Sequence, residues 1–381
     1  MLATEPLISA LAIRDLSDPA RGRHAMQLLL AAVVDALAAR WGCEVVVHRA
    51  PPIVSARDNY DRLYYPPDAV SRDRRYSRWI ARDVLLRTQT SAMIPPALDS
   101  LAARGDADGW RDVLLVCPGV VYRRDVIDRH HVGEPHQVDL WRIRRGGATL
   151  GDADLDEMIA AVVEAALPGA AWTTQPAVHP YTERGRQIDA GAGASAVEIG
   201  ECGLAHPQVI GDAGLVGASG LAMGLGLDRL VMLRKGIPDI RLLRATDPRI
   251  AGQMLDLAPY RAVSAMPAAW RDLSIAIDAG DDAEALGDRV RAALGADADV
   301  VESIEVRSET ARAALPPAAI ARIGVGPGQK NVLVRVTLRA LDRTLTDAEA
   351  NRLRDRIYAA LHRGSAAQWA TAPMRSTRSG S

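Results

Sequence analysis

Phenylalanine is absent from this sequence of 381 residues. By ordinary amino-acid usage, a chain of this length should contain on the order of ten phenylalanines. Tyrosine and tryptophan are present, with 8 and 7 residues, so the sequence has not lost aromatic side chains in general. Chance is a poor explanation for a deficit that is confined to one residue type.

Lysine and cysteine are also scarce. The only lysines are Lys235 and Lys330, so arginine supplies nearly all of the positive charge, which we attribute to coding bias in a GC-rich genome. The cysteines, Cys43, Cys117 and Cys202, lie far apart and are odd in number. That distribution excludes a zinc site built from cysteines and fits a reducing compartment, so we expect a cytoplasmic protein.

Long apolar runs and a strong net charge are missing too. No segment is apolar over a sufficient length to span a membrane, and the N-terminal residues lack the pattern of a signal or transit peptide. The net charge of −1 gives no overall nucleic-acid signal, so contact with RNA would depend on local patches. The hydrophobic content of 48% is ample for a packed core, and the length favours two domains.

The most informative segment is residues 217–243, which begins with small residues and alternate glycines. This pattern predicts a strand that allows close backbone approach, followed by a short amphipathic helix that Gly236 and Pro238 end. Arg229 lies in the first turn of that helix. An arginine suits a polyphosphate, because it is always charged and offers a planar fork of donors. The alternative is a glycine-rich strand packed under a helix, with Arg229 on the surface.

Within this segment, GLGLDRLVMLRKGIPDIRLL (residues 224–243) resembles motif 3 of the class II aminoacyl-tRNA synthetases, in the version found in phenylalanyl-tRNA synthetases. The tail GIPDIRLL is the most specific part, because generic class II enzymes do not carry it. The family has glutamate where this chain has Asp228, and phenylalanine where it has Leu221, Met223 and Leu243. The resemblance implies that Arg229 binds ATP and takes part in catalysis.

A second matching segment contains VYRRDVID (residues 121–128) and PHQ (residues 135–137). Alternating apolar residues predict a hairpin here, with a first strand at 113–117 that Pro118 and Gly119 end. The hairpin resembles motif 2 of the same family, and VYRRDVID is especially similar to the single-chain, organelle-type members. The alternative is a charged surface hairpin.

Motif 2, carried over position by position, implies a set of contacts with ATP. Arg123 would hold the α-phosphate and the amino-acid carboxylate, which makes it the second catalytic arginine. Asp125 would face the adenine amino group, and His131 would contact the outer phosphates. Pro135 stands where the family has a phenylalanine that stacks on adenine, so its contact with the base should be weaker.

The resemblance also predicts where the amino acid binds. Gln137 would bind the substrate ammonium group, with Asp139 supporting it. The segment LLRTQTS (residues 85–91) would bring Ser91 to the ammonium and carboxylate, with Gln89 in place of the family's histidine. Glutamine can donate and accept hydrogen bonds but cannot titrate. The alternative for this segment is an edge strand rich in threonine and serine.

The predicted pocket for the substrate ring departs from the family. VHPYTE (residues 178–183) stands where the family has FPFTE, whose two phenylalanines form an edge-to-face cage around the ring. His179 and Tyr181 replace them and make the cage more polar. Glu183 is the retained acid, near the ammonium or a magnesium ion. Ala222 is the small floor below the ring, so that a para-substituted ring would fit.

A helix at 25–39 followed by a strand at 44–48 is similar to motif 1 of the same family. Motif 1 packs in the core and forms the dimer interface in many class II enzymes. A monomer, as in the single-chain members, and a motif 1 homodimer therefore both remain open.

The C-terminal part of the sequence predicts a separate β-α-β-β-α-β unit of the ferredoxin-like type. Strands are expected at 272–278, 300–306 and 331–338, and helices at 283–294 and 348–361. The unit resembles the ferredoxin-fold anticodon-binding domain that ends phenylalanyl-tRNA synthetases, where RTLTD is typical. Its candidate RNA-binding residues, unless they are simply solvated, are Arg335, Arg339, Arg343, Arg363, Arg375 and Arg378.

We therefore predict an α+β fold. A class II synthetase antiparallel sheet flanked by helices would occupy residues 1–265, a ferredoxin-like anticodon-binding domain residues 271–370, and a flexible tail residues 371–381. The resemblance implies ATP- and Mg²⁺-dependent activation of phenylalanine, or a close aromatic analogue, as an aminoacyl-adenylate. The acyl group would then pass to tRNA(Phe). Such chemistry needs positioning and charge stabilisation more than a protein nucleophile.

The missing phenylalanines allow different interpretations of the pocket. If every phenylalanine was purged, the enzyme could be translated when charged tRNA(Phe) is scarce, and it would serve as a backup or resistance enzyme. If the pocket was retuned instead, the chain would be an adenylating ligase for another aromatic amino acid in a biosynthetic pathway. A third alternative is a catalytically inactive relative that binds tRNA or an amino acid.

Overall fold

The computed structural model describes residues 1–73, 76–105, 109–193, 196–263 and 267–367. The chain divides into two compact units, one with residues 1–125 and 129–265, the other with residues 126–128 and 266–381. The predicted tail at 371–381, with Arg375 and Arg378, lies outside the described residues. In the part that the structure describes, no helix is both long and apolar enough to cross a membrane.

A seven-stranded sheet forms the centre of the first unit, in the order β1-β5-β6-β10-β9-β8-β7. Strands β1 and β5 run parallel, and every other neighbouring pair is antiparallel. The strands are β1 (Glu44–Val47), β5 (Asp112–Val120), β6 (His136–Arg145), β7 (Trp172–Pro176), β8 (Thr182–Ala190), β9 (Val197–Ala205) and β10 (Ala218–Gly226). The predicted α+β class and its flanked antiparallel sheet are confirmed.

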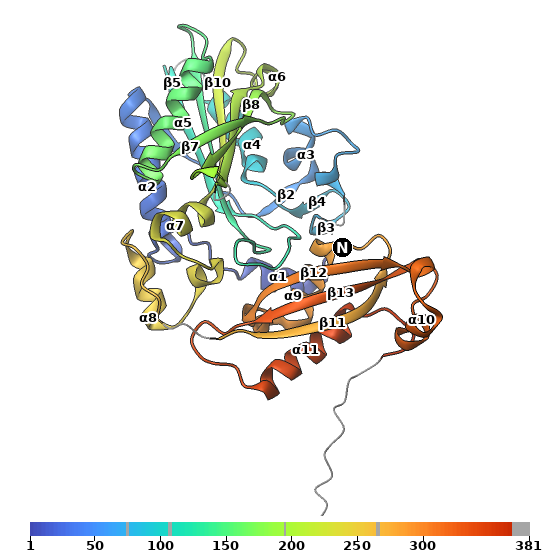
Figure 1. Ribbon diagram of the computed structural model, residues 1–381. Helices are drawn as coiled ribbons and strands as arrows, with labels where there is room; N and C mark the ends of the chain where they lie inside the picture. The colour runs from blue at the N-terminus through green and yellow to red at the C-terminus, as the bar shows by residue number, and fades with distance from the viewer. Residues whose placement is uncertain (74–75, 106–108, 194–195, 264–266, 368–381) are drawn as a thin grey trace, which may run out of the picture. The chain divides into compact units, whose positions relative to one another are not determined.

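Helices cover both faces of this sheet (Figure 1). On one face lie α2 (Ala25–Trp41), α5 (Asp152–Ala166) and α7 (Leu227–Lys235). On the other face, α4 (Ile94–Ala103) and α6 (Pro207–Asp212) pack over buried strand residues such as Cys117 and Trp141. Their apolar side chains exclude water from the sheet, which stabilises this layered arrangement.

Shorter elements border the α4 face. A three-stranded sheet has the order β2-β4-β3, with β2 (Ile53–Ser55), β3 (Trp79–Ala81) and β4 (Val84–Leu86). The remaining helices of this unit are α1 (Thr4–Leu11), α3 (Ala56–Asn59) and α8 (Pro248–Ala251). Residues 87–93 connect β4 to α4, and this connecting segment lies against β5 and β6 of the large sheet.

Strand β5 continues through Pro118 and Gly119 to Val120, so the prediction that these two residues end it is wrong. Pairing with β1 covers residues 113–116 only, so Pro118 lies beyond the end of β1 and its missing N–H removes no bond to that strand. Gly119 is required by close packing: a Cβ there would lie 2.1 Å from an amino nitrogen of the buried Arg87 side chain.

Helix α7 begins directly after the glycine-rich strand β10, as the sequence predicts, and ends at Gly236 in the left-handed region (φ 64°). Lys235 in its last turn is only 1% exposed. Its ammonium donates to the backbone oxygens of Asp256 (2.8 Å) and Ala258 (2.6 Å) and to the Asp256 carboxylate (3.2 Å). The lysine therefore holds the chain after α8 against the end of α7.

The second unit contains a three-stranded antiparallel sheet in the order β11-β13-β12. Helices α9 and α11 pack with the sheet in one apolar core. The elements are β11 (Ala269–Asp278), α9 (Ala283–Leu294), β12 (Val301–Ala311), α10 (Pro317–Ile323), β13 (Gln329–Leu338) and α11 (Asp347–Leu361). Thr346 and Glu349 form a capping box at the start of α11.

This second unit differs from the predicted element order in two ways. Helix α10 lies between β12 and β13, where the sequence analysis placed only a connection. A last strand is not present among the described residues, which reach 367, although the Arg363 N–H donates to the Ala276 oxygen (2.8 Å) on the edge of β11 that faces away from β13. What this unit binds stays a prediction.

Replacement of Lys235 by methionine should destabilise the first unit. Two backbone oxygens would lose the charged donor that they share, which costs about 2 kcal/mol of the free energy of unfolding. Lys330→Met is the matched control, because Lys330 pairs with the half-exposed Glu309 and should cost well under about 1 kcal/mol. Denaturant unfolding measures both variants, and equal losses would contradict the role given to Lys235.

Candidate functional site

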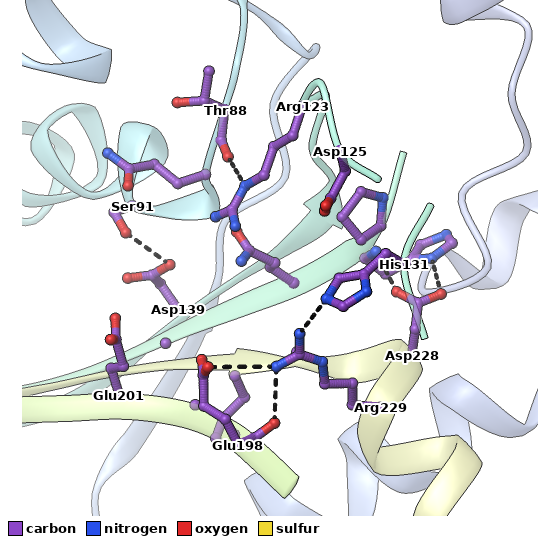
Figure 2. A pocket seen from close by; sticks show the side chains of 18 of the residues that line it. Thr88, Ser91, Arg123, Asp125, His131, Asp139, Glu198, Glu201, Asp228 and Arg229 are labelled. Atoms are coloured by element: carbon purple, nitrogen blue, oxygen red, sulfur yellow. Dashed lines mark hydrogen bonds and ion pairs between the residues drawn. The ribbon is translucent and has the colours of Figure 1, made fainter. Parts of the chain in front are cut away.

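A cavity of about 540 Å³ opens on the α4 face of the large sheet. Strands β6, β9 and β10, the segment after β4, the loop between β5 and β6, and the first turn of α7 all contribute to its lining (Figure 2). The structure brings into this one cavity most of the residues that the sequence analysis singled out: Gln89, Ser91, Arg123, Asp125, His131, Pro135, Gln137, Asp139, His179, Tyr181 and Arg229.

Glu183 and Ala222 are the predicted site residues that do not line the cavity. Glu183 is exposed in β8, where the register shifts between Glu183 and Arg186 and Arg184 adopts a positive φ of 52°. The prediction for Glu183 depended on the resemblance of residues 178–183 to the family's FPFTE segment. Ala222 is 1% exposed and lies within the core, opposite Trp141 in the pairing of β10 with β6.

Arg229 reaches the cavity from the first turn of α7 (Figure 2). Its guanidinium donates to the backbone oxygen of Glu198 (3.0 Å) and lies 3.5 Å from the Glu198 carboxylate. It also lies 3.1 Å from Nε2 of His131, and arginine has no acceptor atom, so this His131 nitrogen accepts. The three groups hold the guanidinium toward the cavity, with the side chain 28% exposed.

Arg123 enters the cavity from the loop between β5 and β6. Its side-chain Nε donates to the backbone oxygen of Thr88 (2.7 Å), and its backbone N–H donates to the backbone oxygen of Gly133 (2.8 Å). Two guanidinium groups from separate elements, Arg123 and Arg229, therefore face one cavity, which is a charge arrangement suited to a polyanion.

Asp139 lies at the other end, on β6, and is 3% exposed. Its carboxylate accepts hydrogen bonds from the hydroxyls of Thr90 (2.6 Å) and Ser91 (3.1 Å) and from Nε1 of Trp141 (3.3 Å). Burial raises the pKa of Asp139 to about 6, and these hydrogen bonds oppose the rise. The group is a buried carboxylate in a cavity wall, where a cationic group would be stabilised.

His136 and Asp228 form a buried contact in the wall of the cavity. Asp228 accepts from the backbone N–H of His136 (2.5 Å) and lies 3.1 Å from Nδ1 of its ring. Nε2 of the ring accepts from the N–H of Leu16 (2.9 Å), so Nδ1 carries the proton and donates to Asp228. The contact joins the start of β6 to the first turn of α7.

Aromatic rings and a polar pair close the cavity near Asp139. Tyr181 stacks on Trp141 with ring centroids 6.2 Å apart and an interplanar angle of 24°, and Tyr65 lies 6.0 Å from Tyr181. Nε2 of His179 lies 2.6 Å from a carboxylate oxygen of Glu201, which also lines the cavity. Figure 2 shows Asp139 and Glu201 on one side of the cavity, and His131 and Arg229 on the other.

Sequence reasoning did not assign several of these residues to the site. Glu198 and Glu201 come from β9, and the available signal was two acidic residues close together in an otherwise apolar strand. Thr88 contributes a backbone oxygen, which no side-chain pattern reveals. Tyr65 and Trp141 gave no sequence signal, since an aromatic residue beside apolar residues is usually part of the core.

The raised pKa of Asp139 predicts a specific dependence of stability on pH. The folded-state pKa lies above the unfolded value, so the stabilisation by this group is full below about pH 4 and is lost as the pH rises through about 6. Relative to Asp139→Asn, the wild-type free energy of unfolding should fall by about 3 kcal/mol across that range. Denaturant unfolding of both proteins at several pH values measures the difference, and a pH-independent difference would contradict it.

Comparison with known proteins adds to this geometry. A family model described as "tRNA synthetases class II core domain (F)" matches residues 14–254. Among curated proteins, the chain is 31% identical over 209 residues to "Phenylalanine--tRNA ligase alpha subunit" of Prochlorococcus marinus (strain NATL2A), which covers 54% of this chain and 59% of that protein. The chain thus spans less than two thirds of that relative's length.

Two further relatives carry the same name. The protein of Mycobacterium avium (strain 104) is 32% identical over 244 residues, which cover 61% of this chain and 67% of that protein. The protein of Deinococcus radiodurans is 30% identical over 256 residues, which cover 62% of this chain and 70% of that protein. Because the family model matches more than half of the sequence and includes every cavity residue named above, the chain belongs to the phenylalanine-type class II tRNA synthetase core family.

Proposed function

We propose that this chain uses ATP to activate an amino acid as an aminoacyl-adenylate and then transfers the acyl group to a tRNA. One observation carries the proposal: a single cavity presents two arginines, Arg123 and Arg229, at one end and the buried carboxylate of Asp139 at the other. An α-amino acid and ATP together present the complementary charges, an ammonium group at one end and a triphosphate at the other.

The first step joins the two substrates. A carboxylate oxygen of the amino acid attacks the α-phosphorus of ATP, the bond between the α- and β-phosphates breaks, and pyrophosphate leaves without any proton transfer. Arg123 orients the α-phosphate and the carboxylate, while Arg229 with His131 stabilises charge on the departing phosphates. Asp139, with Gln137 and Ser91 beside it, binds the ammonium group.

The adenine ring and the metal ion have their own candidate contacts. Asp125 and Pro135 line the cavity on the side of the loop and supply an acceptor for the adenine amino group and a flat apolar contact. Glu183 is exposed and does not line the cavity, so Glu198 is the better candidate carboxylate for Mg²⁺. Bound Mg²⁺ would share the phosphate charge with the arginines, and it usually needs few protein ligands because it keeps water and phosphate oxygens.

Loss of one arginine tests the assignment of the phosphate end. Arg229→Ala should lower the rate of ATP–pyrophosphate exchange by at least about a hundredfold, because the transition state loses a charged donor. Arg234→Ala on the same helix is the matched control, since Arg234 does not line this cavity and should leave exchange nearly unchanged. Equal activity of the two variants would contradict the proposal. Absence of exchange in the wild type, with amino-acid and tRNA binding retained, would favour the inactive relative.

Phenylalanine is the substrate that the relatives' names suggest, and a role as a backup enzyme follows from a chain without phenylalanine. If phenylalanine is the substrate, purified protein with ATP and Mg²⁺ charges tRNA(Phe) with labelled phenylalanine. Expression of the chain should also protect cells from an inhibitor of their ordinary enzyme, because its translation consumes no charged tRNA(Phe). Cells that are inhibited equally with and without the chain would contradict the backup role.

A ligase for a different amino acid is the second candidate, and the pair formed by His179 and Glu201 favours it. His179 stands where the family has a phenylalanine, and Glu201 lines the cavity beside it. A plain phenyl ring would leave both polar groups without solvent or partner beyond each other. Dependence of product on added tRNA separates a tRNA-charging enzyme from a biosynthetic ligase. Light scattering separates the monomer, the motif 1 homodimer and, since the relatives are named alpha subunits, a complex with another chain.

A further inference from the structure

The space that the family resemblance assigns to the substrate ring is filled by this chain's own side chains. Ala222, the expected floor below the ring, is sealed from the cavity and is 1% exposed. Its neighbour across the β6–β10 pairing is Trp141, which is fully buried in the same core. The indole therefore occupies the apolar space beside Ala222.

Trp141 is fixed in that position by contacts on two sides. Its Nε1 donates to the Asp139 carboxylate (3.3 Å), so the indole lies directly beside the proposed ammonium-binding group. Tyr181 stacks on it with ring centroids 6.2 Å apart, and Met93 and Ile94, at the start of α4, belong to the same apolar cluster. A substrate side chain that extends from an ammonium group held by Asp139 meets these rings before it reaches Ala222.

The groups that do face the cavity near Asp139 are mostly polar. Gln89 is already occupied, because it accepts from the Tyr65 hydroxyl (2.8 Å) and donates to the Asn59 oxygen (3.1 Å). Glu201 is 40% exposed at its side chain and keeps acceptor capacity beyond its bond with His179. A short side chain with a hydrogen-bond donor can reach such a group, whereas an acidic side chain would meet Asp139 and Glu201 with like charge.

We propose that the amino-acid end of this cavity selects an uncharged amino acid with a short hydrogen-bonding side chain, such as serine, threonine or asparagine, and excludes phenylalanine because Trp141 occupies the ring space. This inference rests on the proposed adenylate-forming function and names its substrate class. Trp141 acts here as the residue that determines specificity.

The test is ATP–pyrophosphate exchange by the full-length chain with each of the standard amino acids. Serine, threonine or asparagine should exceed phenylalanine in kcat/KM by at least about tenfold. Trp141→Leu opens the ring space and should raise kcat/KM for phenylalanine by at least about tenfold. The preference for the short polar amino acids over phenylalanine should fall accordingly. Trp110→Leu is the matched control, because Trp110 belongs to the same core cluster but its ring lies against Arg145, whereas Trp141 contacts the cavity residues Asp139 and Tyr181.

Tyr181→Phe keeps the ring volume and guards against a Trp141 variant that fails to fold. This variant should still reject phenylalanine, since the stacked ring remains. Phenylalanine exchange by the wild type that equals or exceeds that of the short polar amino acids would overturn the proposal. An unchanged preference in a folded Trp141→Leu protein would overturn it as well.

Binding measured without catalysis separates this proposal from the proposed function. Thermal unfolding with each amino acid present reports binding through the rise in Tm. If short polar amino acids raise Tm and phenylalanine does not, but no exchange occurs, the proposed adenylation is contradicted and the proposed selectivity is supported. If exchange occurs and phenylalanine is preferred, adenylation stands and the selectivity fails. If no short polar amino acid either binds or exchanges, the selectivity falls.

Discussion

The buried contact between His136 and Asp228 determines where the two halves of the site lie. His136 begins β6 and Asp228 stands in the first turn of α7, and the contact uses both the backbone N–H and the ring of the histidine. Gln137 and Arg229 are their immediate neighbours along the chain. A single buried interaction therefore fixes the spacing between the group proposed for the ammonium and the guanidinium proposed for the phosphates. Leu16 extends the same contact to the N-terminal segment.

Around that fixed spacing, the cavity separates charge by sign. Cationic groups enter from the loop between β5 and β6 and from α7, while the carboxylate of Asp139 lies deep on β6. Such a carboxylate destabilises the folded protein when it is ionised without a partner. Destabilising groups of this kind are typical of functional sites, and a bound ammonium group would offset the loss of stability. The aromatic wall of Tyr181 and Trp141 keeps water away from one side of the same carboxylate.

The sequence predicted the elements better than the pocket that they enclose. Glycine spacing and helix-end residues predicted β10 and α7 with Arg229 in its first turn, because these signals are local. The prediction at Pro118 was wrong because it ignored where the neighbouring strand β1 ends. The closed floor over Ala222 was not predictable, since it depends on an indole that comes from another strand and on the cross-strand register. Most of the residues placed by motif share one cavity, whereas Glu183 is exposed in β8 and does not line it.

The arginines of the second unit show how ion pairing changes a positive surface. Arg335 pairs with Asp272, Arg339 with Glu302 and Arg343 with Glu349. A phosphate that approaches any of them competes with a carboxylate that already neutralises the charge, so little is gained from release of counterions. Recognition on such a surface is governed by exchange of partners, and it favours ligands that also stack or fit by shape. Trp270, 65% exposed on β11, places such a ring on the unit that the sequence predicts to bind RNA.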